Sequence, residues 1–215
     1  MFHLIQKSII FISRGGWLIW VLLGCSVVSL AIIIERFIFF LNLNRFNTLR
    51  LMQGIFKYIK KGKIKEALKI CGDNPYYITN IVGEGICRYS EPKEAIREAM
   101  ENKSLYEIPK LEKNLSFLST LAHISPLIGL LGTVMGLVKS FYVIEQKAQS
   151  AGMVNPSDIA GGIWEALLTT VAGLCIAIVS YLAYNYFVYK VNMYILEAEK
   201  ASTELLEIVL ENQKA

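Results

Sequence analysis

Three long apolar runs constrain the fold of this chain more than any other feature, and they cover residues 17–40, 115–144 and 159–189. The hydrocarbon of a bilayer is about 30 Å thick and a helix rises about 1.5 Å per residue, so about 20 apolar residues can cross it. The whole chain is 54% hydrophobic and 19% charged. We therefore predict an all-α membrane protein in which each run forms one transmembrane helix.

The segments outside these runs are predicted to be helical or to connect helices. Residues 1–16 are expected to form an amphipathic helix on the outer surface of the membrane, leading into the first span. Residues 41–114 are expected to form a helical cytoplasmic domain, and residues 190–215 a cytoplasmic C-terminal helix. Residues 145–158 are expected to form a short periplasmic loop.

Helical periodicity is visible at the start of the cytoplasmic segment. The apolar residues with this spacing are Leu49, Met52, Ile55, Phe56 and Ile59. Pro75 and Pro92 suit the first turns of two later helices. The second of these helices is expected to run toward the next span, although Pro109 should kink or break it.

Basic residues are unevenly distributed between the two sides of the predicted spans. Residues 41–114 contain fourteen lysines and arginines, whereas residues 145–158 contain only Lys147. Loops rich in lysine and arginine stay in the cytoplasm. The sequence therefore predicts an N-terminus outside and a C-terminus inside.

The composition argues against several classes of function. A net charge of +4 is too small to indicate a nucleic-acid partner. Cys25, Cys71, Cys87 and Cys175 show no CxxC spacing, which argues against a disulfide framework or a zinc site. No nucleotide-binding or hydrolase motif occurs outside the spans. We therefore predict no enzyme, no catalytic residue, no metal and no cofactor, and we expect the lipid bilayer to be the chain's environment.

The second run contains a narrow strip of small residues, Gly129, Gly132 and Gly136. Small residues at this spacing let helix backbones approach closely in lipid, so helix packing is the simplest interpretation of the strip. Thr133 lies beside it. A lone threonine in a membrane helix commonly donates to its own backbone, so a functional role for Thr133 needs further support.

The third run contains Glu165, the only acidic residue inside it. A carboxylate at the centre of a membrane helix costs about 2.5–3.5 kcal/mol on insertion scales and usually faces a bundle interior or a water path. The alternative is that Glu165 lies near the outer interface and reaches water or a neighbouring loop. At about 100° per residue, Thr169 lies about 40° from Glu165 and Thr170 about 140°. Glu165 and Thr170 therefore do not point to one axis, and Thr169 shares the face of Glu165.

Further small residues follow in the third run, including Gly173 and Ala177, and they suit a pore or a helix contact. His123 and Lys139 are ionisable groups near the ends of the second run, where an interfacial position is expected. If protons cross the membrane here, hydroxyls and one off-centre carboxylate are too few to carry them. A second protein is then expected to supply the main titrating acid.

Two motifs resemble those of a known family. Residues 125–136, SPLIGLLGTVMG, resemble the (A/S)PLLGLLGTVxG signature of the MotA/TolQ/ExbB proton-channel family. Residues 162–178, GIWEALLTTVAGLCIAI, look like its GIxEALxTTxxGLxxAI partner. The three-span layout resembles that of ExbB and TolQ, whereas MotA proteins have four spans. Val179 stands where the family usually has a proline, so the kink expected there is in doubt.

The resemblance implies a homopentamer whose second and third spans line a lumen. In such a family member the lumen holds the single spans of an ExbD- or TolR-like dimer, whose aspartate carries the proton. Thr133 and Thr170 match the family's lumen threonines, and Glu165 matches its glutamate. The family also suggests rotation of the pentamer about the dimer, with force passed outward by the partner.

Three functions remain open at this point. The first is energy coupling in the inner membrane of a Gram-negative bacterium, either for TonB-dependent import with a TonB-like protein or for Tol-Pal envelope maintenance with a TolA-like protein. The second is a passive membrane scaffold. The third, a secondary transporter, is disfavoured because three spans show no internal repeat.

Overall fold

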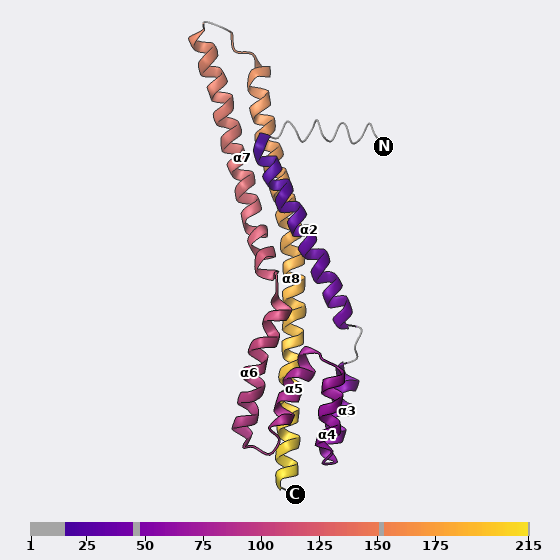
Figure 1. The fold of residues 1–215 in the computed structure, drawn as a ribbon. Coiled ribbons are helices and arrows are strands. Elements are labelled where there is room, and N and C mark those ends of the chain that lie inside the picture. The colour runs from indigo at the N-terminus through magenta and orange to yellow at the C-terminus, as the bar shows by residue number, and fades with distance from the viewer. Residues whose placement is uncertain (1–15, 45–47, 151–152, 215) are drawn as a thin grey trace, which may run out of the picture. The chain divides into compact units, whose positions relative to one another are not determined.

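The structure is a computed structural model that describes residues 16–44, 48–150 and 153–214. The described residues form helices and their connections, without a strand. Figure 1 shows the helices in chain order. They are α2 (Gly16–Asn44), α3 (Thr48–Lys60), α4 (Ile64–Asp73), α5 (Tyr77–Cys87), α6 (Lys93–Glu112), α7 (Leu115–Gln149) and α8 (Pro156–Lys214). The amphipathic helix predicted over residues 1–16 lies outside the described residues, apart from Gly16.

Three of the described helices, α2, α7 and α8, are long and apolar enough to cross a membrane. This confirms the prediction of an all-helical chain with three apolar helices, and the protein is a multi-pass membrane protein. One boundary differs from the prediction. The third span and the C-terminal helix are a single helix, α8, of 59 residues, about three times the number that one span needs. It passes through Val179 without a break.

Other boundaries also differ from the sequence-based expectation. The loop expected over 145–158 is shorter, because α7 extends to Gln149 and α8 begins at Pro156, where a proline needs no helical hydrogen bond for its nitrogen. Pro109 does not end α6, which continues to Glu112. The break lies at Asn114, whose φ of 62° is in the left-handed region that asparagine tolerates. Pro75 and Pro92 precede their helices and lie outside the first turns.

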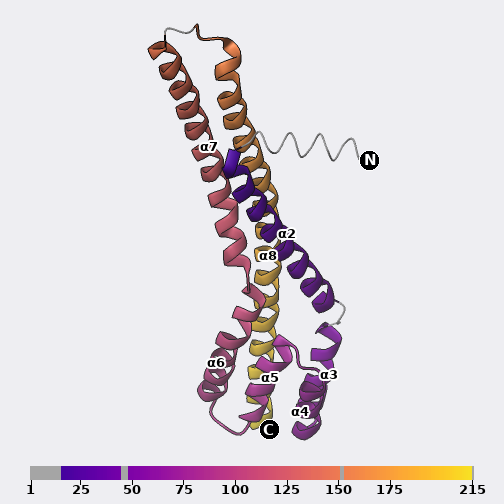
Figure 2. The ribbon, with the colours of Figure 1, turned by 45° about the horizontal axis from the view of Figure 1, so that its top comes forward.

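The chain divides into two compact units. Unit 1 comprises residues 1–37 and 114–185, and unit 2 comprises residues 38–113 and 186–215. In unit 1, the described parts of α2, α7 and α8 run alongside one another (Figures 1 and 2). In unit 2, α3, α4, α5 and α6 contact one another in sequence, and the C-terminal part of α8 supplies a further helix.

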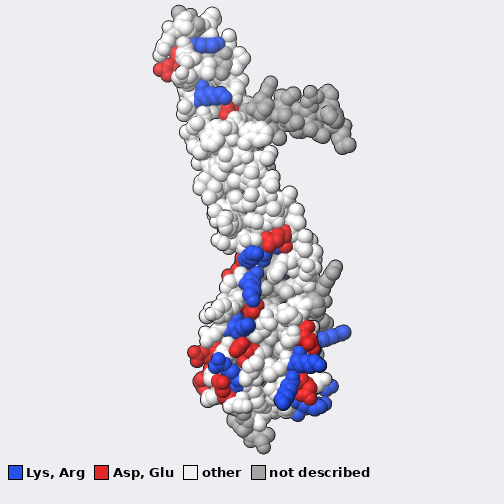
Figure 3. All heavy atoms as spheres, viewed as in Figure 1, with Lys and Arg blue, Asp and Glu red and all other residues white. Residues whose placement is uncertain are grey.

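Unit 1 has large apolar side chains on its surface and small polar ones inside. Leu127 is 63% exposed and Leu167 is 60% exposed, whereas Ser125 and Thr169 are fully buried. The middle of this unit shows no charged side chain on the face drawn in Figure 3, and charges appear only toward its ends. In lipid, helices associate through small residues and hydrogen bonds, because apolar side chains gain nothing by leaving the hydrocarbon. The surface of unit 1 therefore fits a lipid environment.

Unit 2 has the opposite arrangement, with an apolar core. Its fully buried side chains include Ile55, Ile59, Ile78, Ile81, Ile86, Ile96, Met100 and Leu205. The periodicity predicted for α3 places four of its five apolar residues in this core, while Leu49, in the first turn of α3, is exposed. Gly85 in α5 lets Met100 of α6 and Leu205 of α8 approach closely, since a Cβ on Gly85 would lie 2.7 Å from the Met100 sulfur.

Aromatic contacts complete the core of unit 2. The ring of Phe40 stacks on those of Phe187 and Tyr194, with centroids 5.6 and 5.9 Å away. The hydroxyl of Tyr77 donates to Glu197 Oε2 at 3.0 Å. Burial, with the neighbouring carboxylate second, raises the pKa of Tyr77 well above its usual value. These contacts fix the last turns of α2 and the start of the C-terminal part of α8 within one core.

Candidate functional site

The two motif-bearing segments pack against each other in unit 1. The backbone of Gly129 in α7 lies against Gly173 and Thr170 in α8, and Gly136 lies against the Gly162 carbonyl and Ala166. Residue numbers fall along α8 as they rise along α7, so the two helices are antiparallel. The contact at Gly136 depends on glycine, because a Cβ there would overlap the Gly162 carbonyl of α8.

Side-chain hydroxyls add polar links between the same two helices. The Thr170 hydroxyl is 3.1 Å from the Gly129 carbonyl oxygen, across the interface, and 3.1 Å from the Ala166 carbonyl oxygen. The Ser140 hydroxyl donates to the carbonyls of Gly136 and Ile159, at 3.1 Å each. The predicted packing residue Ala177 is buried as well. Each hydroxyl thus has a backbone acceptor, as a buried polar group in lipid requires.

The four predicted path residues occupy three different environments. Thr169 is fully buried, and a Cβ on Gly132 would overlap its side chain, so Thr169 packs α7 and α8 together. Thr133 and Thr170 are half-buried. The Thr133 hydroxyl donates to the Leu130 carbonyl at 2.6 Å, which is the local backbone bond expected of a lone threonine.

Glu165, the fourth predicted residue, forms an ion pair that the sequence reasoning missed. Lys139 Nζ of α7 lies 2.7 Å from Glu165 Oε2 of α8. The side chain of Glu165 is 14% exposed and that of Lys139 is 64% exposed. The available signal was their position, because Lys139 near the end of the second apolar run and Glu165 near the start of the third lie toward the same ends of two antiparallel helices.

A third helix reaches this ion pair. The Glu165 carboxylate lies so close to Gly16, the first residue of α2, that a Cβ there would overlap it. Gly16 has a φ of +66°, a backbone conformation that favours glycine. The positive end of the α2 dipole favours an anion at this position. A cavity of about 570 Å³ adjoins the pair, and its other lining residues include Ser140, Ser157 and Trp164.

The central parts of the three spans contain no side chain that exchanges protons near neutral pH. Residues 17–34, 124–138 and 166–184 include no Asp, Glu, Lys, Arg or His. A further polar contact there joins two buried hydroxyls, Ser29 of α2 and Ser180 of α8, at 2.6 Å. Hydroxyls of this kind can hydrogen-bond water, but they do not release protons at working pH. Lys139 and Glu165 therefore lie outside the uncharged central parts of α7 and α8.

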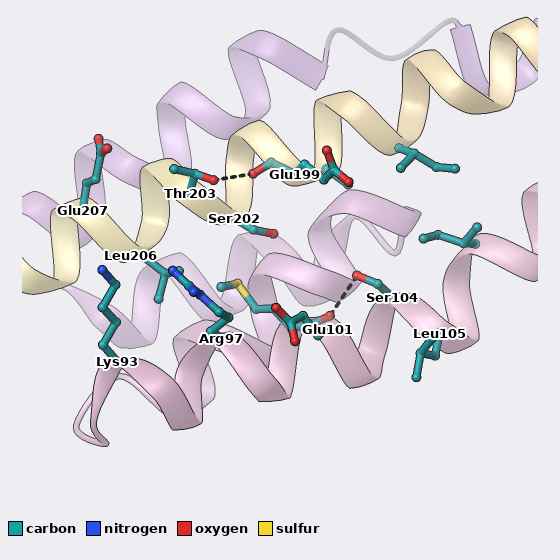
Figure 4. A pocket seen from close by; sticks show the side chains of 14 residues that line it. Lys93, Arg97, Glu101, Ser104, Leu105, Glu199, Ser202, Thr203, Leu206 and Glu207 are labelled. Atoms are coloured by element: carbon teal, nitrogen blue, oxygen red, sulfur yellow. Dashed lines mark hydrogen bonds between the residues drawn. The ribbon is translucent and has the colours of Figure 1, made fainter.

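A groove in unit 2 is lined by several charged side chains. It lies between α6 and α8, and Figure 4 shows Lys93, Arg97 and Glu101 of α6 on one side and Glu199 and Glu207 of α8 on the other. Its volume is about 580 Å³. No group of three or more His, Cys, Asp or Glu side chains is arranged to hold a metal ion anywhere in the described part of the chain.

Comparison with known proteins agrees with the two motifs. A sequence model of the MotA/TolQ/ExbB proton channel family matches residues 75–200, which is more than half of the chain. The chain belongs to this family. The match covers all of α7 and the part of α8 that contains Glu165 and Thr170. The family consists of membrane proton channels, so the contact between α7 and α8 lies in the part of the chain that defines it.

Named relatives place the chain near two branches of the family. It is 32% identical over 173 residues to the protein named ExbB-like 3 of Synechocystis sp., covering 80% of this chain and 81% of that protein. It is 38% identical over 115 residues to the biopolymer transport protein ExbB of Aquifex aeolicus, covering 54% of this chain and 74% of that protein. It is 41% identical over 86 residues to the Tol-Pal system protein TolQ of Haemophilus influenzae, covering 40% of this chain and 36% of that protein.

Proposed function

We propose that this chain is the proton-channel subunit of an energy-transducing motor in the inner membrane of a Gram-negative bacterium. It uses the proton motive force, together with an ExbD/TolR-like partner, to power TonB-dependent import across the outer membrane. The subunit forms a homopentamer, and its second and third spans surround a dimer of the single-span partner. The proposal rests on family membership and on the geometry of unit 1.

The observation that best supports the proposal is the lack of a proton carrier inside the spans. The uncharged stretch of α7, residues 124–138, contains 15 residues, and that of α8, residues 166–184, contains 19. At about 1.5 Å per residue, each is more than 20 Å long. A proton cannot cross that distance on side chains of this chain alone. We therefore assign the carrier to an acid of the partner's span, with Thr133 and Thr170 beside it on the channel wall.

The proposed orientation follows from charge. Residues 41–114 contain fourteen lysines and arginines and are placed in the cytoplasm, with residues 190–215 on the same side. The ion pair of Lys139 and Glu165 then lies toward the periplasmic ends of α7 and α8. The N-terminus lies outside the cytoplasm.

The alternative within the same class is a TolQ-type subunit that works with a TolA-like protein in envelope maintenance. Similarity to the TolQ protein of Haemophilus influenzae favours this alternative as a second candidate. The neighbouring gene separates the two: a TonB-like neighbour supports import, and a Tol-Pal neighbour supports envelope maintenance. A passive scaffold, from a different class, requires no proton motive force at all.

The test compares Thr170→Val with Thr170→Ser in cells that lack the native chain. Valine keeps the size of the side chain but removes the hydroxyl that reaches the Gly129 carbonyl. Both variants are expected to assemble, and only Thr170→Ser is expected to support uncoupler-sensitive import or envelope integrity. Full activity of Thr170→Val, or activity of the native chain that an uncoupler leaves unchanged, supports the scaffold.

A further inference from the structure

The ion pair of Lys139 and Glu165 has a geometry that suits a fixed contact. Its oxygen–nitrogen distance is 2.7 Å, within the range of charge-assisted hydrogen bonds. Glu165 is mostly covered by α2 and α7, while the long lysine side chain comes from the more exposed side. One side of the Glu165 carboxylate is taken by the Lys139 ammonium and another lies against the backbone of Gly16, so contacts within this chain hold the carboxylate where it borders the cavity.

The position of the pair also separates it from the hydroxyls. Glu165 Oε2 is bound by the lysine, whereas the Thr170 hydroxyl is directed to the Gly129 carbonyl. Glu165 and Thr170 differ by about 140° around α8. By this angle, the Glu165 carboxylate and the Thr170 side chain lie on different faces of the helix.

The pair also connects all three apolar helices of unit 1 at one end. Lys139 belongs to α7, Glu165 to α8 and Gly16 to α2. Charges of opposite sign in a membrane protein commonly stabilise each other in this way, because each alone is costly in lipid. Removing one partner leaves the other charge uncompensated, whereas removing both leaves a neutral contact.

We propose that Lys139 is a positioning residue, the fixed counter-ion that holds Glu165 against the start of α2, and that Glu165 ties the three spans together without carrying the transported proton. This inference rests on the proposed function, because it concerns the role of Glu165 in a proton-driven machine.

The test uses two single variants and their combination. Glu165→Gln leaves an unpaired ammonium and Lys139→Met leaves an unpaired carboxylate, so each is expected to reduce uncoupler-sensitive function at least tenfold. The combined variant, Lys139→Met with Glu165→Gln, is expected to recover function to within threefold of the native chain. Lys139→Arg keeps the cation and is expected to function as the native chain does.

The outcomes separate the inference from the function on which it rests. A combined variant that is as inactive as Glu165→Gln, while assembled at native abundance, overturns the inference and makes the Glu165 carboxylate a proton carrier. A Lys139→Met variant with native activity also overturns it. Loss of uncoupler sensitivity in the native chain contradicts the proposed function instead. Abundance and oligomer size, measured for all four variants in detergent, show whether any loss is a failure to fold.

Discussion

The two units of this protein bury opposite kinds of side chain. Unit 2 covers Ile59, Ile81 and Leu205 and exposes charge, as a protein in water does. Unit 1 covers Ser125 and Thr169 and exposes leucine and valine. The same physical rule explains both, because each unit hides what its surroundings solvate poorly. The difference indicates that lipid surrounds unit 1 and water surrounds unit 2. In unit 1, the packing of the helices is therefore determined by small polar residues.

The comparison predicts that the same substitution, leucine to alanine, destabilises unit 2 far more than unit 1. Leu205→Ala removes a fully buried side chain of unit 2 and is expected to cost about 2–5 kcal/mol. Leu127→Ala removes a side chain that is 63% exposed in unit 1, and it is expected to have little effect on stability. Hydrogen exchange of the α5 amides, followed by mass spectrometry in detergent, measures the first effect, since each 1.4 kcal/mol changes the rate of exchange through unfolding tenfold.

A similar loss of stability in Leu205→Ala and Leu127→Ala contradicts the prediction that large apolar side chains are buried in unit 2 and exposed in unit 1. The Leu127→Ala variant is the matched control, because it removes the same atoms from the same residue type. Equal protection of α5 in Leu205→Ala and the native chain places Leu205 outside the cooperative core of unit 2.

Within unit 1, the comparison predicts that a glycine at the contact between α7 and α8 matters more for stability than a glycine away from it. Gly136→Ala places a methyl group against the Gly162 carbonyl, and overpacking of this kind typically costs about 1–3 kcal/mol. Gly161→Ala adds the same methyl group where no atom lies within 4 Å. The second variant is expected to match or slightly exceed the native stability. Thermal unfolding in detergent micelles, read from the helical circular dichroism signal, distinguishes them, and equal melting temperatures contradict the close packing of α7 on α8.

Two exposed cysteines, one in each unit, allow the surroundings of the two units to be compared by chemical labelling. Cys87 and Cys175 are both exposed, the first in unit 2 and the second in unit 1. In chains that keep a single cysteine, a membrane-impermeant maleimide is expected to label Cys87 in inverted membrane vesicles and to leave it unlabelled in intact spheroplasts. Cys175 is expected to stay unlabelled in both, because lipid or neighbouring spans cover it. Labelling of Cys87 from outside contradicts the proposed orientation.

Cys71 provides the control for exposure within unit 2. It is buried, and burial raises the pKa of its thiol to about 11. The thiolate is the reactive form, so Cys71 is expected to label far more slowly than Cys87 at neutral pH in both preparations. Labelling of Cys71 at the rate of Cys87 indicates that the core of unit 2 is open.

Much of this architecture was predictable from local pattern. Hydropathy located the three apolar helices, and the period of Met52, Ile55, Phe56 and Ile59 gave the buried face of α3. The glycine spacing in 129–136 indicated a close helix contact, and the structure places these glycines against α8. These features follow from single helices, whose periodicity is visible in the sequence alone.

Features that depend on two helices were harder to predict. Pairing of Lys139 with Glu165 requires the register of α7 on α8, which hydropathy does not specify. Thr169 was expected on the face of Glu165, but the angle around one helix does not reveal that Gly132 covers it. A kink or break was expected at Pro109, whereas the left-handed conformation of Asn114 sets the break. Each of these outcomes is decided by tertiary packing or by one backbone angle.

The central claim is that the spans of this chain form the wall of a proton path but contain no carrier. Proton flux into proteoliposomes under a potassium diffusion potential, followed with an entrapped pH-sensitive dye, tests it most directly. The purified chain alone is expected to leak no faster than empty liposomes, and flux is expected when the chain is reconstituted with the single-span protein that co-purifies with it from native membranes. Proton flux through the chain alone, abolished by Glu165→Gln, contradicts the claim.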